Sequence, residues 1–225
     1  MTQPHADSAQ RRARWPYPAL MLVTDRARLR GRDPVEVVSA AVDGGVNIVQ
    51  LREKELPPKE LLRQAGELRE ALAGRALLLV NGFPDVVTAT DANGVHLPER
   101  GMGVSTARAA VGEERFVGRS VHSVEAAKSA EREGVDYVVA GTVFATASKP
   151  DGDATGLDFI RKVVGSVSVP ILAIGGITVA NAGDVIAAGA SGIAVIGAIM
   201  DAGDPQRAAS ALYSAIDAAV STRRR

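Results

Sequence analysis

Eight short apolar runs, each followed by a segment with helical periodicity, constrain the fold more than any other feature of the sequence. Each run is rich in Val, Ile and Leu, as expected for parallel strands that are buried on both faces. The runs span residues 20–24, 47–52, 76–81, 94–97, 116–121, 137–141, 170–175 and 192–197. Eight strand-then-helix units predict a single-domain α/β protein folded as a closed (β/α)8 TIM barrel.

The segments between the runs carry helix signals. Leu61, Ala65 and Leu68 lie on one apolar stripe, and Ser123 is a candidate N-cap. The alternative fold is an open doubly wound sheet, which usually has a glycine-rich turn after its first strand. Here residues 24–26 carry no glycine, whereas the seventh and eighth runs end in glycine, where barrels commonly bind phosphate. We therefore expect the closed barrel.

Length and composition narrow the function classes. The 225 residues suit one domain, and 26 basic residues balance 26 acidic ones. A neutral chain gives no support to nucleic-acid or membrane-surface binding. No run approaches the roughly 20 apolar residues of a membrane span. The absence of cysteine excludes disulfides, thiolate metal sites and a cysteine nucleophile, and it is compatible with the cytoplasm, where we expect the protein.

The two ends of the chain differ from its centre. Residues 1–18 are polar and contain proline, without the apolar run of a signal peptide, so we expect a flexible N-terminal arm. The barrel is expected over 19–221, followed by a basic tail at 222–225. A homo-oligomer is compatible with the sequence, which leaves the oligomeric state open.

Two glycine-containing turns are candidates for phosphate binding. The backbone N–H groups of such turns can approach an oxyanion, and the start of the next helix adds favourable partial charge. The turns comprise Gly175 and Gly176 after the seventh run and Gly197, Ala198 and Ile199 after the eighth. The alternative is that these are tight turns that simply need glycine.

Polar side chains on the second run predict an anion site. Because side chains alternate along a strand, Gln50, Arg52 and Lys54 share a face. Polar groups pointing into a barrel are costly unless they meet a ligand or internal partners. An amide, a guanidinium and an ammonium suit an anionic substrate. The alternative is an internal salt bridge with Glu53 or Asp25.

The ends of other runs bring further candidates to the same rim. Ser120 and His122 end the fifth run, where a histidine can relay protons near neutral pH. Position alone leaves a structural, hydrogen-bonded role for His122 equally open, and His96 is a weaker candidate. Four other polar side chains are predicted to bind substrate, namely Asn81, Thr146, Ser148 and Lys149.

Five motifs, in this order, resemble the thiamine-phosphate synthase/TenI superfamily from Leu20 to about Ala211. They are Val49–Lys54, Gly94–Leu97, Gly118–Ser123, Val143–Lys149 and Ala173–Ile177. The resemblance implies that the chain is a TIM-barrel protein of thiamine biosynthesis and that its substrate is a small phosphorylated thiazole.

The resemblance implies one of two activities. The synthase joins hydroxymethylpyrimidine diphosphate to thiazole phosphate, expels pyrophosphate and uses magnesium held by two aspartates. The first aspartate belongs to an Asn-Asp-Arg motif, which reads Asn81-Gly82-Phe83 here, and the second closes a motif that reads 98-PERG-101 here. Both carboxylates are therefore missing. Magnesium prefers oxygen ligands, carboxylates among them, and stabilises charge on a departing phosphate group.

The TenI branch shares Asn81-Gly82 and Leu97-Pro98, and its implied activity is that of a thiazole tautomerase, an isomerase. Residues 146–149 resemble the synthase loop that grips diphosphate instead. Giving more weight to the missing carboxylates, we predict a metal-free tautomerase without a cofactor. His122 would move the proton that converts carboxythiazole phosphate to its aromatic tautomer, while Arg52 and Lys54 would hold the substrate carboxylate.

Two alternatives stay open. The first is the magnesium-dependent synthase, and the second is a non-catalytic, TenI-like regulatory or ligand-binding protein. The sequence lacks a helix-turn-helix pattern, which argues against direct DNA binding.

Overall fold

The computed structural model describes residues 10–146 and 154–223. Its eight parallel strands close into a barrel in sequence order, and β1 pairs with β8 through Leu20 and Ile193. The strands are β1 (Ala19–Val23), β2 (Ile48–Leu51), β3 (Leu77–Asn81), β4 (Gly94–Leu97), β5 (Phe116–Val121), β6 (Tyr137–Gly141), β7 (Ile171–Ile174) and β8 (Gly192–Val195). The predicted TIM barrel is confirmed.

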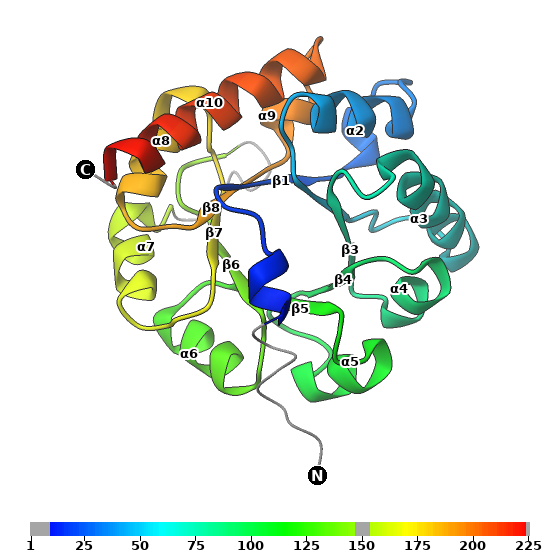
Figure 1. The fold of residues 1–225 in the computed structure, drawn as a ribbon, viewed down its shortest axis with the longest axis horizontal. Coiled ribbons are helices and arrows are strands. Elements are labelled where there is room, and N and C mark those ends of the chain that lie inside the picture. The colour runs from blue at the N-terminus through cyan, green and yellow to red at the C-terminus, as the bar shows by residue number, and fades with distance from the viewer. Residues whose placement is uncertain (1–9, 147–153, 224–225) are drawn as a thin grey trace.

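A ring of helices surrounds the barrel (Figure 1). After the short 3-10 helix η1 (Arg26–Arg28), the helices are α2 (Pro34–Asp43), α3 (Pro58–Leu72), α4 (Pro84–Thr90), α5 (Val104–Val111), α6 (Val124–Arg132), α7 (Gly156–Val164), α8 (Val179–Ala187), α9 (Gly197–Met200) and α10 (Pro205–Arg223). Helix α10 runs past the predicted barrel end at residue 221. The basic Arg223 in its last turn interacts favourably with the helix dipole.

Local capping explains where several helices begin. The Asp33 side chain accepts hydrogen bonds from the backbone N–H groups of Val35 and Glu36, and Ser123 accepts one from Ala126. These caps satisfy N–H groups that have no partner within the helix. The predicted N-cap at Ser123 is therefore confirmed, and the loop between β5 and α6 is short.

The core has two layers. Residues such as Val49 and Leu51 of β2 point outward to the helices, in the larger buried cluster. A smaller cluster fills the barrel interior and includes Ile48, Phe116 and Tyr137. Since side chains alternate along a strand, the inward position of Ile48 also directs Gln50 into the barrel.

A short helix over residues 10–14, drawn in blue in Figure 1, lies across the end of the barrel where the strands begin. The Trp15 ring stacks on Tyr137 with 4.5 Å between ring centroids, and Arg11 Nε lies 2.7 Å from Asp136 Oδ1. These residues belong to the segment for which the sequence predicts a flexible arm, and here they pack against the barrel. Residues 1–9 lie outside the described residues.

No helix within the described ranges combines the length and the apolar character that crossing a membrane requires.

Candidate active site at the C-terminal rim

The second strand places two of its three predicted polar residues at the barrel mouth. Gln50 is only 3% exposed, and its Nε2 lies 3.8 Å from Met21 Sδ, a weak contact. Arg52 is half-buried, and its backbone N–H donates to Thr24 Oγ1 at 3.0 Å. Strand β2 ends at Leu51, so strand alternation does not extend to Lys54, which is exposed in the following turn.

Asp25 and Glu53 are the carboxylates that an internal salt bridge would pair with Arg52 or Lys54, but both contact other residues. Asp25 pairs with Arg28 at 3.2 Å, and Glu53 accepts the backbone N–H of Arg26 at 2.9 Å. Within residues 10–146 and 154–223, no salt bridge joins Arg52 or Lys54 to a carboxylate. The alternative of an internal salt bridge is therefore not realised, and both cations are available to an anion.

A buried hydrogen-bonded chain connects three neighbouring strands inside the barrel. His96 Nδ1 lies 2.9 Å from the Tyr137 hydroxyl, and His96 Nε2 lies 2.9 Å from Ser120 Oγ. Burial, with a smaller contribution from the Arg52 charge, lowers the pKa of His96 to about 3. Burial also raises the pKa of Tyr137 well above its usual value, with a smaller effect from Asp136. Both rings are therefore neutral near pH 7.

Sequence reasoning missed Tyr137 and ranked His96 low. One sequence signal could have indicated a large inward side chain on a neighbouring strand. Gly118 lies two residues before Ser120, on the same face of β5, and leaves space inside the barrel. A Cβ atom at Gly118 would lie 2.0 Å from Tyr137 Cζ, so glycine is what lets the ring cross the barrel.

His122 follows β5 and pairs with a carboxylate on the next rim loop. Its Nδ1 lies 2.7 Å from Glu99 Oε2, and its backbone N–H donates to Glu99 Oε1 at 3.1 Å. Both oxygens of Glu99 are thus engaged by one residue. The His122 side chain is 43% exposed, so solvent reaches this pair.

The glycines after β7 are required by the backbone even without a ligand. Gly175 and Gly176 have φ values of +108° and +63°. A Cβ atom at Gly175 would lie 2.4 Å from Thr142 Cγ2, and one at Gly176 would lie 2.4 Å from the Ala145 carbonyl oxygen. The turn therefore needs glycine for conformation and close packing, and phosphate binding there stays a prediction.

The remaining predicted residues are only partly described. Asn81 ends β3 and is half-buried, and Thr146 is half-buried near the end of the described loop after β6. Gly197, Ala198 and Ile199 form most of the four-residue helix α9. Ser148 and Lys149 lie outside the described residues.

The described residues at the two positions expected to hold magnesium do not fit the ion. Gly82 and Gly101 offer no side-chain oxygen, and the Glu99 carboxylate is held by His122. The described part of the chain contains no cluster of three or more His, Asp or Glu side chains that could hold a metal ion. Since magnesium demands near-octahedral oxygen coordination, this donor set is unsuitable.

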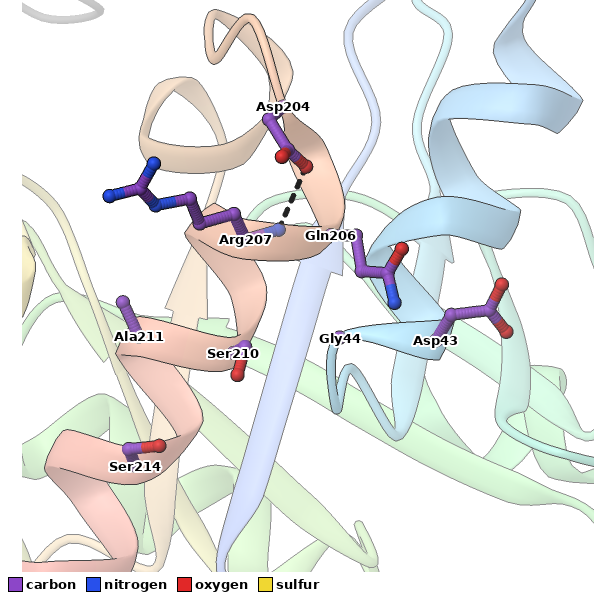
Figure 2. A pocket seen from close by; sticks show the side chains of 8 residues that line it. All are labelled: Asp43, Gly44, Asp204, Gln206, Arg207, Ser210, Ala211 and Ser214. Atoms are coloured by element: carbon purple, nitrogen blue, oxygen red, sulfur yellow. Dashed lines mark hydrogen bonds between the residues drawn. The ribbon is translucent and has the colours of Figure 1, made fainter.

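A cavity elsewhere on the molecule does not compete with the rim. It lies on the outside of the ring, between α2 and α10, and opens to solvent (Figure 2). Asp43, Gln206 and Ser210 are among the residues that line it. None of the residues predicted to bind substrate lines this cavity.

Comparison with known proteins decides the family. The family model described as thiamine monophosphate synthase (TMP-TENI) matches residues 20–199. The chain belongs to the thiamine-phosphate synthase/TenI family. The predicted superfamily resemblance is therefore confirmed.

Members of this family match the chain over nearly their whole length. A protein named thiamine-phosphate synthase from Methanoculleus marisnigri is 45% identical over 202 residues, which cover 89% of this chain and 96% of that protein. A protein of the same name from Clostridium botulinum is 43% identical over 195 residues, covering 86% and 95%. The solved thiamine phosphate pyrophosphorylase from Pyrococcus furiosus has a TM-score of 0.82 at 38% identity, covering 90% and 96%.

The predicted tautomerase activity is wrong, because these similar family members carry the name of the synthase. The prediction of an isomerase rested on the carboxylates missing at Gly82 and Gly101 and on two short motifs, Asn81-Gly82 and Leu97-Pro98. Similarity spread over about 200 residues outweighs them. The roles given to His122, Arg52 and Lys54 in that reaction are withdrawn with it, whereas their place in the substrate site stays a prediction.

Proposed function

We propose that this chain is a thiamine-phosphate synthase, a transferase that joins hydroxymethylpyrimidine diphosphate to thiazole phosphate and releases pyrophosphate. The observation that carries the proposal is the 45% identity to a protein of that name, spread over 89% of this chain and 96% of the relative. The family model matches residues 20–199, a range that reaches from β1 to β8.

The rim supports this chemistry with cations and backbone donors. The N–H groups of the Gly175-Gly176 turn suit the thiazole phosphate, and the start of α8 adds partial positive charge. Arg52 and Lys54, which have no carboxylate partner in the described residues, suit the diphosphate. Gln50 and Ser120 offer an amide and a hydroxyl to polar atoms of the ring that enters the mouth.

Expelling pyrophosphate concentrates negative charge on the leaving group, and electrostatic stabilisation lowers the barrier to such a step. The two positions expected to hold magnesium carry no carboxylate, so we assign this stabilisation to cationic side chains of the protein, with half-buried Arg52 as the first candidate. Thr146, Ser148 and Lys149 remain proposed diphosphate ligands.

The test is incubation of the purified protein with both substrates, followed by measurement of thiamine phosphate and pyrophosphate in equal amounts. Arg52→Met should lower kcat, because it removes the charge while keeping much of the side-chain volume. The matched control is Arg63→Met, which removes an exposed arginine on α3 paired with Glu67 and should leave kcat unchanged. Absence of thiamine phosphate with the unaltered protein, with and without added magnesium, would refute the proposal.

Two expectations from composition stay proposals. We place the protein in the cytoplasm because it has no cysteine and its proposed substrates are metabolites, and we leave a homo-oligomer as a prediction. Fractionation of cells and sedimentation of the purified chain would test them.

A further inference from the structure

The hydrogen-bonded side chains of Tyr137, His96 and Ser120 connect the end of the barrel where the strands begin to the mouth where they end. Tyr137 begins β6 and is fully buried, His96 is 2% exposed in β4, and Ser120 is half-buried near the end of β5. The two heavy-atom distances are both 2.9 Å. Only Ser120, at the upper end, is accessible to a substrate.

Close packing holds the Tyr137 ring in one position. The Trp15 ring stacks on Tyr137 with 4.5 Å between centroids, and Gly118 leaves no room for a side chain beside that ring. The Tyr137 hydroxyl is therefore held against His96 Nδ1. In the described residues, His96 is the hydrogen-bond partner recorded for this hydroxyl.

The number of hydrogen atoms on these three side chains determines which atom donates and which accepts in each hydrogen bond. A protonated Tyr137 has one O–H, and His96 Nδ1 is the acceptor beside it. If Nδ1 carried the imidazole proton instead, the Tyr137 O–H would be left buried without an acceptor, at a cost of about 1–3 kcal/mol. Tyr137 therefore donates to Nδ1, and the neutral imidazole carries its proton on Nε2. That N–H donates to Ser120 Oγ, so the serine O–H is free to point elsewhere.

We propose that Tyr137 and His96 are positioning residues that hold Ser120 as a hydrogen-bond donor toward the substrate in the barrel mouth. The inference rests on the proposed function for the identity of the substrate. Because His96 N–H occupies a lone pair of Ser120 Oγ, the serine hydroxyl presents its proton to the mouth. With one of its two lone pairs occupied, Ser120 Oγ keeps its O–H and a single lone pair for the mouth. The position therefore favours an acceptor, such as an unprotonated ring nitrogen or an anionic oxygen, over a second donor.

The direct test reads the tautomer of His96 in the unliganded protein. Two-bond 1H–15N correlation spectra of 15N-histidine-labelled protein distinguish Nε2–H from Nδ1–H imidazole. The chain has three histidines, so His5→Gln and His122→Asn assign the signals by their disappearance. We expect His96 to show only Nε2–H over about pH 5–8, a range in which an unperturbed imidazole would titrate. Nδ1–H, a mixture of tautomers or an imidazolium in this range would overturn the proposal.

The kinetic test uses variants that remove single links. Tyr137→Phe removes the hydroxyl that fixes the tautomer, and it should lower kcat/KM about five-fold, the factor that one neutral hydrogen bond of typical strength represents. Ser120→Ala should lower it at least as much. The double variant should be no worse than Ser120→Ala, because the tyrosine acts through the serine. Equal effects of Tyr137→Phe with and without Ser120 would overturn the proposal.

Two matched comparisons keep the result interpretable if a variant folds poorly. His96→Gln retains an N–H near the position of Nε2 and should keep more activity than His96→Met, which has similar length and no donor. Tyr213→Phe makes the same chemical change at α10, where the ring packs against Gly45, and should leave kcat/KM unchanged. Failure to make thiamine phosphate would refute only the proposed function, because the NMR measurement needs no substrate.

Discussion

Gly118→Ala should destabilise the protein although it adds a single methyl group. The new Cβ would lie 2.0 Å from Tyr137 Cζ and 2.1 Å from Cε1, whereas carbon atoms pack at about 3.5–4.0 Å. The ring would have to move by roughly 1.5 Å, which its stacking on Trp15 opposes and which the 2.9 Å hydrogen bond to His96 would not survive. Overpacking costs about 1–3 kcal/mol and the hydrogen bond about 1 kcal/mol. We therefore expect a loss of about 2–4 kcal/mol in the free energy of unfolding.

Urea unfolding followed by circular dichroism and by Trp15 fluorescence measures this loss, since Trp15 is the single tryptophan of the chain. The matched control is Gly66→Ala in α3, where a Cβ has open space, and where alanine should stabilise the helix by about 0.5–1 kcal/mol. In a Tyr137→Leu background, Gly118→Ala should cost less, because the opposing ring is gone. A Gly118→Ala protein as stable as its parent, or a cost independent of the Tyr137 ring, would refute the reasoning.

Three further predictions concern charge. Arg11→Met removes one of the two arginine partners of the buried Asp136, which keeps Arg108 at 2.6 Å, and should cost about 1–3 kcal/mol in urea unfolding; unchanged stability would mean that the Arg11 pair contributes nothing. Because the pKa of folded His96 is about 3, below its unfolded value, the unfolded state binds the additional proton between these values. Stability should therefore fall as the pH drops below about 6.5, by up to about 1.4 kcal/mol per pH unit, and His96→Gln should remove this part of the slope. Gly82→Asp with Gly101→Asp should create magnesium binding in the presence of pyrophosphate, detectable by calorimetry, and no heat above that of the parent protein would contradict our account of the rim.

Helix and strand positions could be predicted because their causes are local. The apolar runs mark strands buried on both faces, and Ser123 caps α6 with an atom three residues from the N–H that it binds. Eight such units in sequence order leave few topologies other than a closed barrel. The family could also be predicted from the sequence, since the motifs at the strand ends survive in order.

The activity was predicted wrongly because the missing magnesium carboxylates and two short motifs were given more weight than the rest of the chain. The sequence does lack carboxylates at Gly82 and Gly101, yet similarity to a protein named thiamine-phosphate synthase extends over 89% of this chain. Two missing carboxylates concern a single site, whereas sequence identity over most of the barrel concerns the residues of the core and of the rim alike.

The sequence by itself determined the barrel, the helix starts and the face on which Gln50 lies, because the alternation of strands and the spacing of helices act over a few residues. Only the tertiary structure decided the partners of the polar side chains. The His96–Tyr137 contact joins residues 41 positions apart, and the Glu99–His122 pair joins residues 23 positions apart. Such contacts depend on the register between neighbouring strands and on the space left by Gly118. No local pattern encodes these, because the free energy of a buried hydrogen bond depends on which groups the whole fold brings within reach.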